Sequence, residues 1–283
     1  MTFLISFFAS LISLPLITRF AYNNNLIDYK NDRKQVRKPI PRIGGLSIFL
    51  GFCLAICFLI INNDLNLKIN GIEVLLILAI GFFLIGFVDD LFNISPWPRL
   101  LIQVALSTVA WFQNLKVEFI DFTFLNIGLD YLMLPNYISL LLTIIWIVGL
   151  TNAINWIDGL DGQAAGVTII GIISLLIINL KLQQFDIIYP IIALLGVSIS
   201  FLKYNFYPAK IIMGDGGSYL LGFLLAFFSI ISVTQYPEDL SVSSATAMYI
   251  PIMLFSVPII DMVAVIFYRT LDGRSPFFPD NLH

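Results

Sequence analysis

Long apolar stretches constrain this chain more than any other feature of its sequence. Nine of them follow one another, each about 17 to 22 residues long, which is enough for a helix to cross the apolar core of a bilayer. Because backbone N–H and C=O groups in lipid must pair within their own segment, such stretches form helices. The expected spans are residues 1–21, 43–61, 72–88, 99–115, 136–153, 164–180, 187–203, 218–234 and 246–267.

The composition agrees with this interpretation. Only 12% of the residues are charged and 59% are hydrophobic, whereas about a quarter of the residues in a soluble domain are charged. The first span has neither a basic start nor a small-residue cleavage pattern, so we take it as a retained helix. We predict an all-α polytopic membrane protein with about nine transmembrane helices in a single domain, residues 1–283.

The distribution of Lys and Arg predicts the orientation. One set of loops carries twelve of these cations and the other set carries three, Lys68, Lys116 and Lys181. Loops rich in Lys and Arg stay in the cytoplasm. The N-terminus is therefore expected outside and residue 283 inside.

Four polar clusters fall on the side expected to be cytoplasmic. They read GFVDDLFNISPWPR (86–99), NAINWIDGLDG (152–162), YPAKIIMGDGGS (207–218) and DGRSPFFPDNLH (272–283). The outer loops lack such clusters, and one of them, 117–136, alternates enough to form a hairpin. The chemistry is therefore expected at the cytoplasmic face of the membrane.

Two of these clusters stand directly before an expected helix. Asp161 and Gly162 precede the span 164–180, and Asp215 precedes the span 218–234. A helix N-terminus offers unpaired N–H groups and a positive dipole end, which suit phosphate, and neighbouring glycines let a bulky anion approach the backbone. Carboxylates would repel that phosphate unless a cation lay between them. Mg²⁺ joins carboxylates to substrate phosphates, so we expect Mg²⁺, for which Mn²⁺ can substitute.

The same residues have plainer interpretations. An Asp before a helix, such as Asp161, is often only an N-cap. Asp89 and Asp90 could be a solvated pair, although the C-terminal end of a helix disfavours carboxylates because the helix dipole is negative there. The basic stretch 30–42 could anchor the chain at the cytoplasmic face or contact a phosphate.

These motifs resemble those of a known family, the polyprenyl-phosphate N-acetylhexosamine-1-phosphate transferases. The similarity covers nearly the whole chain and lies in the four polar clusters, while PIPRIGGLSIF (39–49) and SPFFPDNLH (275–283) are similar to the GlcNAc-1-phosphate branch. The resemblance implies transfer of GlcNAc-1-phosphate, or a related sugar-1-phosphate, from a UDP-N-acetylhexosamine to undecaprenyl or another polyprenyl phosphate. UMP would be released, Mg²⁺ would be required, and the product would start a lipid-linked surface glycan at a bacterial cell membrane.

The resemblance also implies roles for individual residues. Asp89 and Asp90 match the family's catalytic acidic pair, which handles the lipid phosphate and the metal, and Asp215 matches its Mg²⁺ ligand. Arg99 keeps a cation near a position where the family commonly has Lys and this chain has Trp97. The residues that match donor-binding positions are Asn152, Asn155, Asp158, Asp161, Arg274 and His283.

Two further departures from the family pattern stand at the ends of the motifs. The last family motif continues as His-x-His-His and leads into another helix, whereas this sequence stops at His283, so we expect the last family helix to be lacking. The first loop has Val36 where the family often has His.

Several alternatives stay open from the sequence. The lipid phosphate could attack the donor directly, with Asp90 in the metal site and Asp89 near the lipid phosphate, or one of these aspartates could act as a covalent nucleophile. A non-catalytic family member is an alternative, and so is a transporter, which would need ionisable groups near the membrane midplane. No nucleic-acid partner is expected, and a homodimer is left open.

Overall fold

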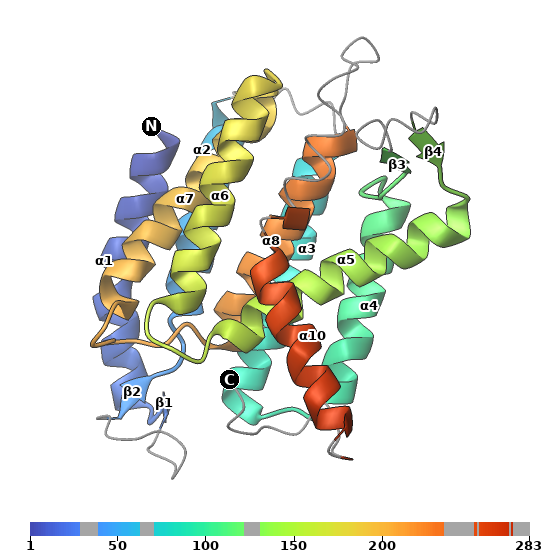
Figure 1. The fold of residues 1–283 in the computed structure, drawn as a ribbon. Coiled ribbons are helices and arrows are strands. Elements are labelled where there is room, and N and C mark those ends of the chain that lie inside the picture. Colours follow the sequence, from blue (N-terminus) through green and yellow to red (C-terminus); the bar gives the residue numbers. More distant parts are fainter. Residues whose placement is uncertain are drawn as a thin grey trace.

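The computed structural model describes residues 1–28, 39–62, 71–121, 131–234, 252–253, 255–271 and 273. These residues form nine helices and two short strand pairs (Figure 1). In chain order the elements are α1 (Thr2–Asn23), β1 (Ile27–Asp28), β2 (Ile40–Pro41), α2 (Gly45–Ile61), α3 (Gly71–Phe92), α4 (Pro96–Phe112), β3 (Phe119–Asp121), β4 (Tyr131–Met133), α5 (Asn136–Ile157), α6 (Gln163–Lys181), α7 (Phe185–Asn205), α8 (Gly214–Thr234) and α10 (Ser256–Leu271).

The apolar stretches form helices, as predicted. Six helices in the described part of the chain are long and apolar enough to cross a membrane, namely α1, α3, α5, α6, α7 and α8, and α2 is a shorter apolar helix. The predicted spans 99–115 and 246–267 correspond to α4 and α10, which have 17 and 16 residues. The prediction of an all-α polytopic membrane protein is confirmed.

Helix α8 lies at the centre of the bundle (Figure 1). It packs against α2, α3, α5 and α6, and 94% of the residues in its apolar stretch are buried. Two buried serines of α8 tie it to its neighbours, because Trp146 Nε1 of α5 donates to Ser229 Oγ at 2.8 Å and Asn179 Nδ2 of α6 donates to Ser232 Oγ at 2.8 Å. Polar contacts of this kind join helices in a membrane, where apolar burial alone does not favour association.

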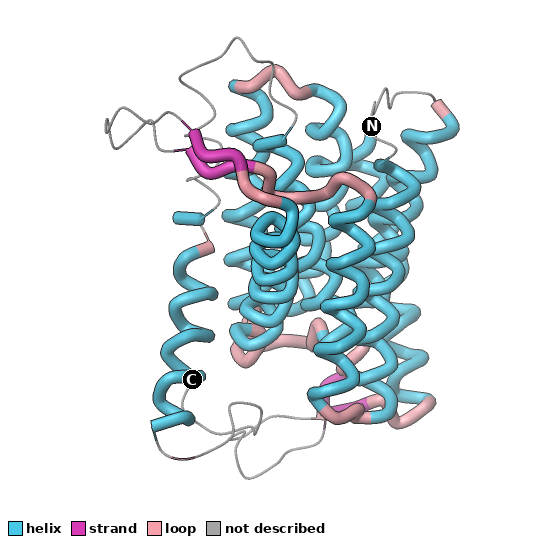
Figure 2. Tube along the Cα trace, turned by 90° about the vertical axis from the view of Figure 1, so that its right-hand side faces the viewer, coloured by secondary structure: helices cyan, strands magenta, loops and turns pink. Residues whose placement is uncertain are grey.

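The remaining helices surround this centre. Helix α1 packs against α7 and α2, α4 packs against α5 and α3, and α10 packs against α5 at the outside of the bundle (Figure 2). The strand pair β1–β2 lies at one end of the bundle and the pair β3–β4 lies at the other (Figure 1). In β3–β4, Ile120 is opposite Leu132, which confirms the hairpin predicted within 117–136.

Candidate active site

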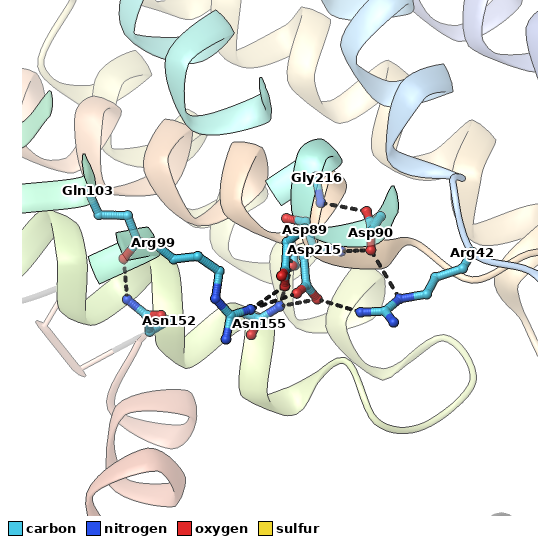
Figure 3. Close-up of polar contacts among 10 residues, drawn as sticks. Arg42, Asp89, Asp90, Arg99, Gln103, Asn152, Asn155, Asp215 and Gly216 are labelled. Carbon is cyan, nitrogen blue, oxygen red and sulfur yellow. Dashed lines mark hydrogen bonds and ion pairs between the residues drawn. The ribbon is translucent and has the colours of Figure 1, made fainter. Parts of the chain in front are cut away.

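Five segments bring polar side chains together (Figure 3) at the end of the bundle that carries β1 and β2 (Figure 1). Helices α3 and α5 end there, and helices α2, α4 and α8 begin there. The side chains that meet are Arg42, Asp89, Asp90, Arg99, Asn155 and Asp215. We call this group the carboxylate cluster.

Asp90 holds the start of α8. Its Oδ1 accepts a hydrogen bond from the backbone N–H of Asp215 and its Oδ2 accepts one from Gly216, both at 2.9 Å. Arg42 Nε lies 3.0 Å from Oδ1, and only 1% of the Asp90 side chain is exposed. The prediction that this helix start binds phosphate is therefore wrong for these two N–H groups, because a carboxylate from α3 occupies them.

Asp215 lies between two cations. Its Oδ2 is 3.1 Å from Arg99 Nη1, and its Oδ1 is 3.4 Å from Arg42 Nη2 and accepts a hydrogen bond from Asn155 Nδ2 at 2.9 Å. Charge-assisted contacts like these are stronger than hydrogen bonds between neutral groups. Because 15% of the Asp215 side chain remains exposed, a ligand can still reach this carboxylate.

Asp89 is the third carboxylate of the cluster. Its Oδ2 pairs with Arg99 Nη1, while its Oδ1 is buried without a hydrogen-bond partner among the described residues. A buried carboxylate oxygen that lacks a partner is unfavourable. Such an atom therefore fits a ligand that donates a proton or carries positive charge.

Three carboxyl groups face two guanidinium groups in the cluster. Burial alone would lower the pKa of Arg42, but the carboxylates of Asp215 and Asp90 outweigh that effect and raise this pKa above its ordinary value. Arg42 therefore remains a fixed positive charge.

Close backbone packing positions these groups. Gly44 N donates to Ile212 O at 3.0 Å and Gly45 N donates to Met213 O at 2.7 Å, so the segment that carries Arg42 runs along the segment that leads into α8. A Cβ added at Gly45 would lie 2.2 Å from Gly217 N. A Cβ at Gly217 would lie 2.7 Å from Gly45 Cα, and one at Gly216 would lie 3.1 Å from Phe87 N. The space beside these two glycines is therefore filled by neighbouring helices, whereas the glycines next to Asp215 were expected to give an anion access to the backbone.

The residues of NAINWIDGLDG do not all reach the cluster. Asn155 does, but Asn152 Nδ2 donates to Gln103 Oε1 of α4 at 2.7 Å (Figure 3). Asp158 is the C-cap residue of α5. Asp161 Oδ2 accepts a hydrogen bond from Ala209 N at 3.1 Å, which ties this loop to the segment between α7 and α8.

The interpretation of Asp161 as an N-cap is wrong. Gly162 is the N-cap residue of α6 and has φ +74°, a left-handed conformation that glycine adopts readily.

Of the other residues that the sequence predicts for the site, Arg274 and His283 lie outside the described residues.

Sequence reasoning missed Arg42 and Gln103. Arg42 was one of many cations in a basic stretch, and only its contact with Asp90 and Asp215 distinguishes it. Gln103 could have been identified from the sequence. It is a polar residue within an apolar span, four positions after Arg99 and hence on the same helix face.

Two carboxylates of the cluster, those of Asp89 and Asp215, are candidates for a cation site shared with a substrate. Among the described residues, no three His, Cys, Asp or Glu side chains are grouped so as to hold a metal by themselves. Mg²⁺ often takes only one or two carboxylates and completes its shell with substrate phosphates and water. The partnerless Asp89 Oδ1 and the accessible Asp215 carboxylate are oxygen donors of that kind.

Comparison with known proteins agrees with this geometry. Residues 72–233, which include all but the first residue of α3, the helices α4 to α7 and all but the last residue of α8, match the glycosyl transferase family 4 model. A probable undecaprenyl-phosphate N-acetylglucosaminyl 1-phosphate transferase of Bacillus subtilis (strain 168) is 31% identical over 99% of this chain and 74% of its own length.

Two further relatives carry related names. A decaprenyl-phosphate N-acetylglucosaminephosphotransferase of Mycobacterium tuberculosis is 30% identical over 91% of this chain and 67% of its own length. A phospho-N-acetylmuramoyl-pentapeptide-transferase of Staphylococcus haemolyticus is 32% identical over 80% of this chain and 73% of its own length. The resemblance found in the motifs is confirmed, and the chain belongs to glycosyl transferase family 4.

Proposed function

We propose that this protein transfers GlcNAc-1-phosphate from UDP-GlcNAc to undecaprenyl phosphate or a related polyprenyl phosphate, with release of UMP. The names of the Bacillus and Mycobacterium relatives support the lipid and the sugar phosphate. The observation that carries the proposal is the carboxylate cluster, in which Asp215 lies between Arg42 and Arg99 at the end of a membrane-spanning bundle.

In the proposed reaction, an oxygen of the lipid phosphate attacks the phosphorus that bears the sugar. The bond from that phosphorus to the bridging oxygen breaks, and the oxygen leaves with UMP. The second pKa of a phosphate monoester is about 6, so the nucleophile is largely ionised near neutral pH. A general base and a covalent aspartyl intermediate are therefore unnecessary, and we favour direct attack.

The main task of the site is to bring together anions that repel each other. Two unit charges about 4 Å apart repel by roughly 4 kcal/mol at an effective dielectric constant near 20. Arg42 and Arg99 are held at the cluster by Asp90, Asp89 and Asp215. Cations that are already in place stabilise the charge of a phosphoryl-transfer transition state without reorganising during the reaction.

We assign the metal-holding role to Asp215 and Asp89. From the sequence, Asp90 was expected to share the metal site with Asp215, but both carboxylate oxygens of Asp90 accept backbone hydrogen bonds from α8. Asp89 Oδ1 has no such partner among the described residues. When bound, Mg²⁺ would neutralise phosphate charge, which is its general contribution to phosphoryl transfer.

We further propose that the cluster faces the cytoplasm. The twelve Lys and Arg residues assigned to cytoplasmic loops include Arg42 and Arg99, which belong to the cluster. The positive-inside rule supports that orientation. It would expose the site to a soluble nucleotide sugar while the lipid phosphate arrives from the membrane.

The test is a transfer assay with the purified protein in detergent. It uses undecaprenyl phosphate, Mg²⁺ and either UDP-GlcNAc or UDP-MurNAc-pentapeptide, and both UMP and the sugar-bearing lipid are measured. We expect product from UDP-GlcNAc that disappears with EDTA and returns with added Mg²⁺ or Mn²⁺. Product from UDP-MurNAc-pentapeptide alone would overturn the choice of sugar, and a monodisperse protein that makes no product from either donor would overturn the function.

The variant Asp90→Asn tests whether Asp90 acts by positioning the start of α8 or by contacting the substrate. An amide cannot accept both backbone hydrogen bonds, so one N–H of α8 would face an NH₂ group, and a loss of about 1–3 kcal/mol in the free energy of unfolding follows. We expect both the Tm and the transferase rate to fall. Asp186→Asn, in the first turn of α7, is the control. A large loss of rate with an unchanged Tm would show that Asp90 acts on the substrate and not through α8.

A further inference from the structure

A cavity of about 370 Å³ lies where α1 ends and α7 gives way to the segment before α8. The end of α1 lies at the same end of the bundle as the strand pair β1–β2 (Figure 1). None of the cluster residues lines the cavity. The described residues that line it are Pro15, Thr18, Arg19, Tyr22, Tyr204 and Lys210.

Two cations, Arg19 and Lys210, stand at this cavity. Arg19 and Lys210 are exposed, and neither makes an ion pair with any residue that the structure describes. The Lys210 ammonium group lies 6.0 Å from the centre of the Tyr204 ring, which is within the range of a cation–π contact. The site therefore offers positive charge to an anion, and the described residues of its wall include no acidic side chain that could hold a metal ion.

The surface beside the cavity is apolar. Helix α1 turns Leu14, Ile17 and Ala21 into the bundle. Its outer face carries Leu16 and Phe20, which are 66% and 54% exposed. A helix face of this kind meets acyl chains, and cations and tyrosines next to it belong at the level of the lipid headgroups.

We propose that this cavity binds the headgroup of an anionic phospholipid, with an acyl chain lying along the outer face of α1. Arg19 and Lys210 would contact the phosphodiester, and Tyr22 and Tyr204 would flank it. The polyprenyl phosphate substrate is a poorer match. Its phosphate must reach the carboxylates on α3 and α8, whereas α1 packs mainly on α7 and α2.

The test adds equimolar phosphatidylglycerol and phosphatidylcholine to the purified protein in detergent. Native mass spectrometry then measures how much of each lipid is bound to the protein. Each cation near a membrane surface favours an anionic lipid roughly fivefold. We expect wild type to prefer phosphatidylglycerol by about 25-fold, and R19Q/K210Q to lose that preference. Because both side chains are exposed, the double variant should elute from size exclusion like wild type.

Two further variants make the result specific. Lys203→Gln removes an exposed cation of α7 that does not line the cavity, so it should keep the preference. Thr18→Trp fills the cavity without changing its charge, so it should lower phosphatidylglycerol binding.

Three outcomes would overturn the proposal. One is an unchanged preference in R19Q/K210Q, and another is an equal loss in Lys203→Gln, which would mean a general effect of surface charge. The third is displacement of phosphatidylglycerol by equimolar undecaprenyl phosphate, which would assign the cavity to the substrate.

Discussion

Asp215→Asn is expected to lower the transferase rate by about 10³-fold, because loss of one preorganised electrostatic group at a reacting phosphate typically lowers kcat by 10²–10³-fold. The amide is nearly the same size, and its oxygen can still accept a hydrogen bond from Arg99 or Arg42. The NH₂ group of the new side chain must face donors, either Arg99 Nη1 or the pair Arg42 Nη2 and Asn155 Nδ2. The free energy of unfolding should therefore fall by about 1–3 kcal/mol. Rates of UMP release and thermal unfolding of the same preparation measure both effects.

The control for this variant is Asp186→Asn, which makes the same chemical change in the first turn of α7. Asp186 lies about 20 residues before the end of α7 that approaches the site, or about 30 Å along the helix axis. Its rate should match wild type. If Asp215→Asn retained more than a tenth of the rate, Asp215 would have no role in holding metal or phosphate.

Gly86→Ala is expected to lower activity by about 100-fold, because a displacement of about 1 Å at a reacting group has an effect of that order. A Cβ at residue 86 of α3 would lie 2.2 Å from Asp215 O and 2.6 Å from Gly216 N. Both contacts are with backbone, so α3 and the start of α8 must move apart. Overpacking of this kind destabilises by about 1–3 kcal/mol, so the Tm should fall as well.

Gly149→Ala is the matched control for this substitution. Gly149 lies within α5, and a Cβ there would meet nothing within 4 Å. Alanine favours a helix over glycine by about 1 kcal/mol, so this variant should be at least as stable as wild type and fully active. Wild-type activity in Gly86→Ala would mean that the close approach of α3 to α8 does not set the geometry of the site.

The helices could be predicted because a single physical requirement defines them. A chain that crosses a bilayer needs apolar runs of sufficient length, and these are visible in the sequence without knowledge of contacts. The predicted span 164–180 and the observed α6, Gln163–Lys181, differ by one residue at each end. The end of α8 nearest the site was predicted less well. The span was expected from residue 218, but the helix begins at Gly214, so Asp215 lies in its first turn.

The partners of the site residues could not be predicted in the same way. Asp90 and Gly216 are separated by 126 positions, yet their hydrogen bond decides how α8 begins. The chemistry of the Asp90 carboxylate was evident from its residue type, but only the packing of α3 on α8 shows which backbone groups it meets. The role of Arg42 could not be predicted for the same reason, because nothing in the neighbouring sequence distinguishes it from the other cations of its loop.

Asn152 and Asn155 illustrate the limits of a motif. They lie three positions apart on α5, so helical periodicity places them on neighbouring parts of one face. Asn155 nevertheless contacts Asp215, while Asn152 contacts Gln103 of α4. The motif identified the right stretch of chain, and the neighbouring helices decide which of its side chains reaches the carboxylate cluster.

The most direct test of the central claim is to follow the phosphorus atom that bears the sugar. UDP-GlcNAc labelled with ³²P at that phosphate would be incubated with the protein, undecaprenyl phosphate and Mg²⁺, and the lipid and nucleotide products would be separated. Transfer of sugar-1-phosphate predicts that the label enters the lipid and that unlabelled UMP is released. Label recovered in UDP, with a lipid that gained only the sugar, would contradict the account.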